Sequence, residues 1–326
     1  MPFNRRALCA SLLPVGATLF APKLFAAPNI PAGMLKIDAP FSPGGTADVL
    51  ARVIAQKLNT KYGQSVVVEN HAGMGGNLGA GIVSKGSADG SSLLLGTIGI
   101  HSAHAVYRSL PYNPEKDLQP VIILGGVPCA VVVNNAKPFK TLSELIAFAK
   151  KNPGGLFFGS AGTGSSTHMV GELFQQAAGV KLTHVPYKGS AAAMNDLIGG
   201  QIDMMFELLT TAGSFIEAGR IRALAVTSKN RSQVVPNVPT VSELAVPGFD
   251  GTGWFTIATS AKVPAATVNQ LNKDINDILR EPELQPQWKK LALDVMGGTA
   301  EQARQYVASE TVKWNKVIET AQIKAE

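Results

Sequence analysis

The sequence contains few cysteines, few aromatic residues and few charged residues for its length. Cysteine occurs twice in 326 residues, aromatic residues make up 6% and charged residues 16%. So few cysteines exclude a scaffold held together by disulfides, and so few aromatics exclude a stacking surface for single-stranded nucleic acid. The charged fraction lies below the usual value of about 25%, which together with 45% hydrophobic residues excludes a disordered chain. The length predicts roughly two domains of about 150 residues each.

Motifs of several common enzymes and cofactor sites are also missing. No serine lies in GxSxG, the nucleophile motif of α/β-hydrolases, and no GxxxxGK[ST] phosphate loop occurs. Gly73-Met-Gly75 begins like a dinucleotide fingerprint, but Leu78 occupies the third glycine position. His101 and His104 have no third metal ligand near them in the sequence. No run of Lys or Arg marks a nucleic-acid surface. We therefore expect no catalysis, no metal, no cofactor and no nucleic-acid partner.

The first 26 residues have the layout of an export signal. Arg5 and Arg6 precede the apolar, uncharged segment 7–20, and small residues follow, with a predicted cleavage after Ala26. The apolar segment is shorter than the roughly 20 residues that span a bilayer, and Pro14 interrupts it. A general secretory signal and a twin-arginine signal both remain open. The sequence thus predicts a periplasmic protein whose mature chain carries a net charge of +3 instead of +6.

Removal of this signal would leave the mature chain with one cysteine. Cys9 lies in the signal, and Cys129 lies in the apolar stretch 126–131. A single cysteine forms no internal disulfide, and an apolar setting favours a packing role over a reactive one. We expect Cys129 to be buried in the core.

Beyond the signal, short strand patterns alternate with helical patterns. The predicted strands are apolar runs bounded by turn residues, at 35–39, 65–69, 93–97, 130–133, 156–160, 182–186, 202–206 and 222–227. Apolar residues at helical spacing, some preceded by capping boxes, predict helices at 47–59, 141–150, 268–278 and 299–317. This alternation predicts an α/β fold with mainly parallel sheets flanked by helices.

Two glycine-rich turns stand between a predicted strand and a predicted helix. The first, at 40–48, contains Pro-Gly-Gly-Thr, and the second, at 160–168, contains two glycines among serines and threonines. A helix N-terminus has unpaired N–H groups and a partial positive charge, and glycines let an anion approach the backbone. Each turn therefore suits a carboxylate, although each is also explained by ordinary helix capping. Two such turns suggest two lobes that close on one ligand.

The same residues resemble a known family. The segment Phe41-Ser-Pro-Gly-Gly-Thr-Ala-Asp48-Val-Leu-Ala-Arg52 resembles the opening motif of the Bug family, the periplasmic substrate-binding components of tripartite tricarboxylate transporters. Further family motifs follow in the same order, at 66–70, 110–114, 159–168, 184–189, 199–203 and 224–228. The resemblance covers essentially the whole mature chain, and it is specific for the family but not for the ligand.

The chain departs from the family pattern at two places. His71-Ala72 stands where the family commonly has Arg-Pro, and Glu207 stands where it often has Asp. Two interpretations remain open. Position 207 faces the ligand and changes the size or charge of the pocket, or both positions lie on the rim or surface.

The resemblance implies a two-lobed flytrap fold with the ligand in the cleft between the lobes. We expect the chain to cross between lobes near residues 127 and 228. The first lobe would then comprise 27–127 plus 228–326, and the second lobe 128–227.

The resemblance also implies which residues bind the ligand. Backbone amides of the first turn, with bridging waters, would hold a carboxylate at Gly44, Gly45 and Thr46, with Asp48 in support. The second lobe would contribute residues of the other turn, namely Ser160, Gly162, Thr163 and Ser166. Six further candidates either face the cleft or belong to the core or surface: Phe41, Thr97, His101, Lys188, Phe206 and Glu207.

The resemblance implies a binding protein and not an enzyme. The protein would capture a small organic carboxylate as a monomer and deliver it to the membrane permease subunits of the transporter. Two alternatives remain open: a binding protein that reports its ligand to a periplasmic sensor domain, and an enzyme on the same fold.

Overall fold

The computed structural model describes residues 30–31 and 33–325. The predicted export signal, residues 1–26, lies outside the described residues. The strands are β1 (Leu35–Ala39), β2 (Val66–Asn70), β3 (Ser92–Thr97), β4 (Leu118–Val133), β5 (Phe157–Ser160), β6 (Thr183–Pro186), β7 (Met204–Leu208), β8 (Arg222–Val226), β9 (Thr252–Ser260) and β10 (Asp294–Gly297). The α-helices are α1 (Thr46–Tyr62), α2 (Asn77–Ser84), α3 (Ile98–His101), α4 (Ala103–Val106), α5 (Leu142–Lys151), α6 (Ser166–Ala178), α7 (Ser190–Ile198), α8 (Leu209–Glu217), α9 (Val241–Leu244), α10 (Ala265–Arg280), α11 (Gln285–Lys290) and α12 (Ala300–Ala321).

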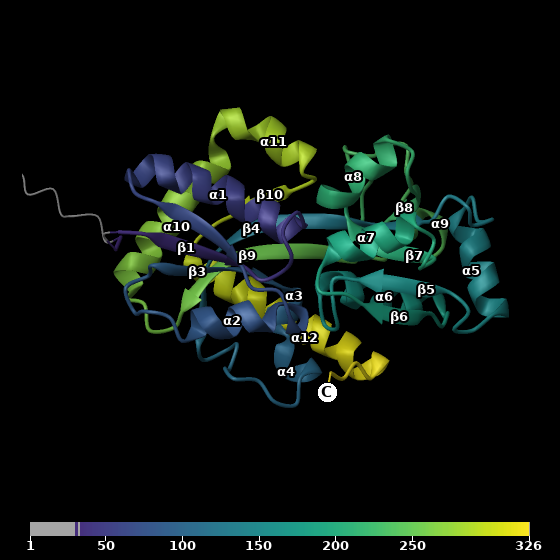
Figure 1. Ribbon diagram of the computed structural model, residues 1–326, viewed down its shortest axis with the longest axis horizontal. Helices are drawn as coiled ribbons and strands as arrows, with labels where there is room; N and C mark the ends of the chain where they lie inside the picture. Colours follow the sequence, from purple (N-terminus) through teal and green to yellow (C-terminus); the bar gives the residue numbers. More distant parts are fainter. Residues whose placement is uncertain (1–29, 32, 326) are drawn as a thin grey trace, which may run out of the picture.

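The long strand β4 joins two sheets. Its residues 118–128 pair with β9, whereas Cys129–Val133 pair with β7 and β8. The first sheet has the order β2-β1-β3-β9-β4, with β10 also paired to β4. The second sheet continues from β4 through β7 and β5 to β6, with β8 on β4. We call the parts built on these two sheets the first and the second lobe (Figure 1).

Within each lobe, the outer strands run parallel to one another. β1 pairs in parallel with β2 and β3, and β5 pairs in parallel with β6 and β7. The strands β4 and β9, which run through the middle of the molecule, pair antiparallel to their neighbours. Parallel strands need a crossover helix between them, which explains why strand and helix alternate in the outer parts of each lobe.

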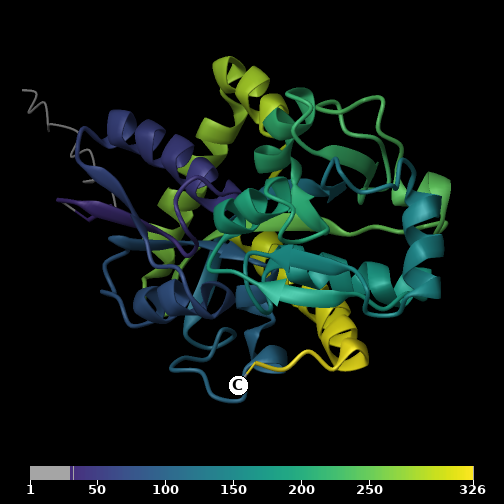
Figure 2. The ribbon, with the colours of Figure 1, turned by 45° about the vertical axis from the view of Figure 1, so that its right-hand side comes forward.

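The C-terminal helix α12 contacts both lobes. It packs against β4, α3 and α4, and it also contacts α6 of the second lobe (Figures 1 and 2). The side-chain amide of Gln176 on α6 donates to the carbonyl of Val317 on α12 at 2.9 Å.

No described helix combines the length and the apolar character that a membrane span requires.

The structure confirms the predicted α/β alternation and adds elements that were not predicted. All eight predicted strands are present, and the helices at 142–151 and 300–321 begin at the capping boxes of Thr141 and Thr299. β9 and β10 were not predicted. β9 contains the fully buried Thr256 and Thr259, which interrupt its apolar residues.

The core contains the lone cysteine, as predicted. Cys129 is fully buried in β4 and forms no disulfide. Burial raises the pKa of its thiol well above the usual value, so the thiol stays protonated and unreactive.

The predicted lobe boundaries near 127 and 228 stay a prediction. In this fold, β4 changes partners between Pro128 and Cys129, and the Gly251 amide donates to the Thr227 carbonyl at 2.8 Å beside the second sheet.

Candidate functional site

Loops at the carboxyl ends of β1, β3, β5, β6 and β7 meet between the two lobes. Ligands bind at this edge in open α/β sheets. The loops line a small cavity of about 30 Å³. Residues of both lobes line it: Phe41, Gly45, Thr46, Ala47, Thr97, Ala161, Ser165, Ser166, Thr167, Ser190, Leu208 and Phe255. The two glycine-rich turns predicted to share one ligand therefore lie at one cavity.

The first turn ends at the N-terminus of α1. Gly45 is the N-cap residue, and no side chain caps the helix there. Gly44 has the positive φ of the turn, +83°, and its amide donates to Asp48 Oδ2 at 3.0 Å. Burial alone would raise the pKa of Asp48, but hydrogen bonds from Arg52 and the Gly44 amide lower it below its usual value. Asp48 therefore holds the turn as an ionised carboxylate, while Gly45 and Thr46 face the cavity.

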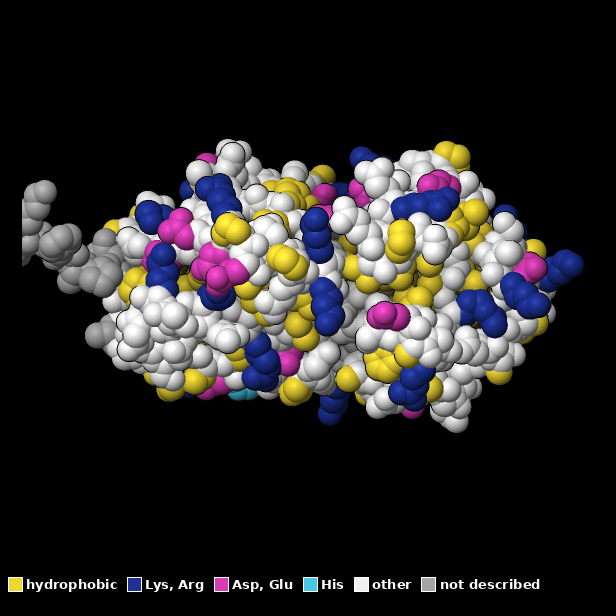
Figure 3. Space-filling view, turned by 90° about the horizontal axis from the view of Figure 1, so that it is seen from above, with side chains coloured by type: hydrophobic (Ala, Val, Ile, Leu, Met, Phe, Trp, Pro, Cys, Tyr) yellow, Lys and Arg dark blue, Asp and Glu magenta, His cyan; other side chains and the backbone are white. Residues whose placement is uncertain are grey.

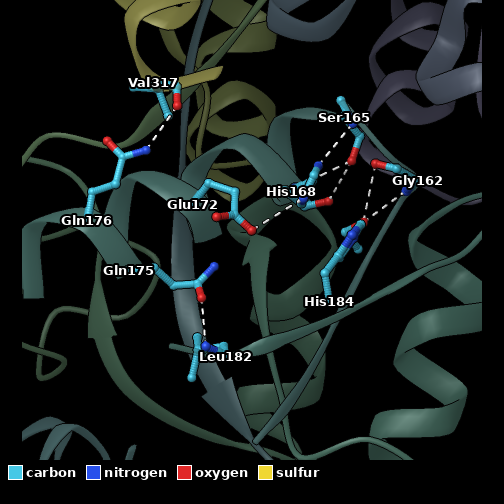
Figure 4. Close-up of polar contacts among 12 residues, drawn as sticks. Gly162, Ser165, His168, Glu172, Gln175, Gln176, Leu182, His184 and Val317 are labelled. Carbon is cyan, nitrogen blue, oxygen red and sulfur yellow. Dashed lines mark hydrogen bonds and ion pairs between the residues drawn. The ribbon is translucent and has the colours of Figure 1, made fainter. Parts of the chain in front are cut away.

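The second turn is held by two stacked imidazoles (Figure 4). The rings of His168 and His184 lie 3.7 Å apart, nearly parallel. His184 Nε2 lies 2.6 Å from Ser160 Oγ, which accepts from the Gly162 amide, and His168 Nδ1 accepts from the Gly164 amide. Burial lowers the pKa of His184 to about 3, so it stays neutral.

The remaining candidates of the second turn have different surroundings. Ser166, the first residue of α6, lines the cavity, whereas Ser160 and Gly162 bond within the turn. The Thr163 carbonyl accepts from the Tyr107 hydroxyl of the first lobe at 2.8 Å. The second turn therefore presents one of its predicted residues to the cavity, and the other three shape the loop.

The structure adds two helix N-termini that the sequence analysis missed. Ser190 opens α7 and lines the cavity, and the N-cap Gly189 leaves the helix without a side-chain cap. Leu208, the N-cap of α8, lines the cavity as well. The helices α1, α7 and α8 thus have N-termini without side-chain caps beside this cavity. Their combined partial positive charge favours an anion there.

Three hydroxyl groups around the cavity lack hydrogen-bond partners within the described chain. They are the buried side chains of Thr46, Thr97 and Ser166. A buried hydroxyl without a partner costs about 1–3 kcal/mol, so proteins rarely keep such groups by chance. Hydroxyls can donate to the oxygens of a carboxylate.

Three other sequence candidates, His101, Phe206 and Lys188, do not line the cavity. His101 is buried, stacks on Trp254 and contacts Thr256 Oγ1 at 3.2 Å, and it borders a separate groove beside α12. Phe206 is a core residue packed against Phe158 and Phe174. Lys188 is exposed, although its carbonyl accepts from the Ser42 hydroxyl at 2.8 Å. Phe41 lines the cavity.

Glu207 lies behind the cavity wall. It is fully buried on β7, directly before the lining residue Leu208. Its Oε1 accepts from the Thr211 hydroxyl, and its Oε2 has no hydrogen-bond partner within the described chain. Burial raises its pKa to about 7, although the hydrogen bond from the Thr211 hydroxyl lowers it.

The two lobes are in close contact around the cavity. The Ser42–Lys188 and Tyr107–Thr163 hydrogen bonds join the loops of the first lobe to those of the second. A Cβ atom built on Gly99 of α3 would lie only 1.9 Å from the carbonyl oxygen of Gly164. Such a close approach of two backbones requires glycine. Glycines therefore make this closed arrangement possible.

The other departure from the family pattern, at His71, forms a structural pair with Asp38. Its Nδ1 lies 2.5 Å from Oδ2 of Asp38, which is buried on β1. Burial raises the pKa of Asp38 to about 6, although His71 lowers it. Neither residue lines the cavity.

Replacing His71 by alanine is expected to destabilise the protein without weakening ligand binding. The buried Asp38 carboxyl would lose its partner, at about 1–3 kcal/mol of unfolding free energy near neutral pH. Urea unfolding and calorimetric titration with the ligand measure the two effects. His104→Ala, at an exposed histidine, is the matched control and should leave both unchanged. A folded His71→Ala variant that binds its ligand more than about tenfold more weakly would contradict this structural role.

A two-lobed α/β fold with a small cavity between its lobes is typical of solute-binding proteins. The chain matches the model of the tripartite tricarboxylate transporter family receptor over residues 50–323. It therefore belongs to this family of receptors, and the resemblance inferred from the sequence is confirmed. Within the described residues, no three His, Cys, Asp or Glu side chains gather as a possible metal site.

Individual relatives agree with this assignment. The chain is 35% identical to the protein BugT of Bordetella pertussis over 294 residues, 90% of either chain. The structure of R. palustris Rpa4515 with adipate matches with a TM-score of 0.87 and 36% identity, over 90% of this chain and 99% of that one. The structure of MatC from Rhodopseudomonas palustris with bound malate matches with a TM-score of 0.82 and 29% identity, over 89% of this chain and 100% of that one.

Proposed function

We propose that this protein captures a small organic carboxylate in the cavity between its lobes. The observation that carries the proposal is the set of three buried, unpartnered hydroxyls, on Thr46, Thr97 and Ser166, around one cavity. The uncapped N-termini of α1, α7 and α8 add electrostatic attraction for an anion. Two relatives were determined with the carboxylates adipate and malate, which supports this class of ligand.

Capture requires the lobes to move apart and close again. A cavity of about 30 Å³ has room for one or two waters and not for a dicarboxylate. The ligand therefore enters an open form and stabilises the closed one by contacts to both lobes. We place the crossings between the lobes near 127 and 228. Lys and Arg side chains along the line where the lobes meet favour the approach of an anion (Figure 3).

The cellular role follows from the family and the N-terminal sequence pattern. Residues 1–26 export the chain to the periplasm, by the general secretory or the twin-arginine route. There the protein acts as a monomeric binding protein, without catalysis, and delivers its carboxylate to the permease subunits of a tripartite tricarboxylate transporter.

Small-angle scattering tests the capture mechanism. Adipate and malate serve as first probes, and calorimetry identifies which of them binds and at what concentration it saturates the protein. The radius of gyration of the saturated protein should be smaller than that of the ligand-free protein. An unchanged radius at saturating ligand would contradict closure, and binding of neither acid would count against the ligand class.

A further inference from the structure

A buried tyrosine of the first lobe holds a backbone carbonyl of the second lobe. Tyr107 is 7% exposed, and its hydroxyl donates to the Thr163 carbonyl at 2.8 Å. Gly75 of the first lobe lies against the same carbonyl, because a Cβ atom built on this glycine would overlap the Thr163 oxygen. The second glycine-rich turn thus places a carbonyl between a hydroxyl and a backbone segment of the opposite lobe.

The first lobe fixes the backbone around Tyr107 by bonds of its own. The Tyr107 amide donates to the Ala103 carbonyl at 2.8 Å. The Ala325 amide, near the C-terminus, donates to the Val106 carbonyl at 2.9 Å. Burial raises the pKa of Tyr107 to about 12, so the hydroxyl stays protonated and able to donate at neutral pH. Closure therefore brings Thr163 to a donor whose backbone is already held, and little backbone freedom is lost when the bond forms.

The bond between Tyr107 and Thr163 lies outside the ligand cavity, since neither residue lines it. The bond joins the two lobes, so it requires the closed arrangement. Closure without a ligand would bury the hydroxyls of Thr46, Thr97 and Ser166 without partners, which favours the open form until a ligand arrives. The bond therefore stabilises the ligand-bound protein and not the ligand-free one.

We propose that Tyr107 is a positioning residue that holds the closed lobes together and sets how long the ligand stays bound, without touching the ligand. This inference rests on the proposed function, because it needs a ligand that closes the lobes. The ligand enters an open form in which the bond is absent, whereas its release requires the lobes to separate and the bond to break. The hydroxyl therefore acts on the dissociation rate and leaves the association rate unchanged.

Tyr107→Phe tests this role, because it removes the hydroxyl and keeps the ring. The probe is adipate or malate, whichever binds the wild type. The Thr163 carbonyl loses this donor in the closed form, so we expect the dissociation constant to rise about 5- to 30-fold. Stopped-flow mixing should place this change in the dissociation rate, with an association rate within about twofold of the wild type. The melting temperature of the ligand-free variant should equal that of the wild type, because the open form lacks the bond.

Tyr112→Phe is the matched control. Tyr112 is 6% exposed, and its hydroxyl donates to Asn77 Oδ1 at 2.6 Å within the first lobe. This bond does not depend on closure. Its loss should lower the melting temperature of the ligand-free protein and leave the dissociation constant unchanged, which is the reverse of the result expected for Tyr107→Phe.

The outcomes separate this inference from the proposed function. A folded Tyr107→Phe that binds the probe within about twofold of the wild type would overturn the inference and leave the carboxylate function intact. An equal loss of affinity in Tyr112→Phe would also overturn it, because the effect would then come from packing within the first lobe. A loss of affinity that lies in the association rate would overturn it as well. Binding of neither acid by the wild type would overturn the proposed function instead.

Discussion

Replacing Gly99 by alanine is expected to remove tight ligand binding by blocking closure. A Cβ on this residue would lie 1.9 Å from the Gly164 carbonyl oxygen. The oxygen belongs to the backbone and the Cβ is bonded to it, so no side-chain rotation can relieve the clash. Gly99 does not line the cavity, and alanine suits its position in α3. We expect the ligand affinity to fall at least about 100-fold, because the closed state loses its population. Calorimetry measures the loss of affinity.

Scattering and a second glycine variant separate closure from misfolding. The radius of gyration of Gly99→Ala should stay at the ligand-free value when the probe ligand is added, while its circular dichroism matches the wild type. Gly199→Ala is the control, because this glycine is exposed at the end of α7 and meets only atoms of its own helix. Normal binding by Gly99→Ala would show that ligand capture does not use the closed arrangement.

Removing the three unpartnered hydroxyls is expected to abolish ligand binding by removing groups of the binding site, and not by blocking closure. Thr46→Val and Thr97→Val keep the side-chain shape, and Ser166→Ala removes a single oxygen. A hydrogen bond to a charged group contributes about 1.5–3 kcal/mol, so each change should weaken binding by at least about tenfold. The triple variant should lose about 1,000-fold or more if the effects add. Calorimetry with the probe carboxylate gives all four dissociation constants.

Ser102→Ala is the matched control for these variants. Ser102 also has a buried hydroxyl without a partner in the described chain, but it does not line the cavity. Its replacement should leave the dissociation constant unchanged. A triple variant that folds and still binds the carboxylate within about threefold of the wild type would show that the hydroxyls do not contact the ligand.

The sequence predicted the strand–turn–helix units because each depends on local features. The turn before α1 has glycines where the chain turns and an acid, Asp48, in the first helical turn, and the structure shows both. The positive φ belongs to Gly44, whereas Gly45 has an ordinary φ of −80°. A pattern of residues thus indicates that a tight turn exists, but it does not tell which glycine takes the unusual backbone angle.

The direction in which side chains point could not be predicted. Ser160, Gly162 and Thr163 belong to the same motif as Ser166, yet only Ser166 faces the cavity. The other residues bond within the turn or to the opposite lobe, and the His184 ring that organises them comes from a different strand. These contacts depend on tertiary packing, which the spacing of residues along the chain does not encode.

The apolar part of the site was missed for a related reason. Leu208 and Phe255 line the cavity but carry no chemical signal that separates them from core residues. Ser190 did have a signal, since it follows a glycine directly after a predicted strand, as at the other two turns. A systematic comparison of every strand–glycine–hydroxyl sequence would have found it.

The central claim is that the cavity recognises the negative charge of a carboxylate. It is tested most directly by calorimetric titration of the wild-type protein with a panel of dicarboxylates that includes adipate and malate, each compared with its neutral diamide. The diamides keep the shape and lack the charge that the hydroxyls and helix N-termini attract. We predict that at least one acid binds with a dissociation constant below about 10 μM and that its diamide binds at least about 100-fold more weakly. A diamide that binds as tightly as its acid, or a panel in which no acid binds, would contradict the account.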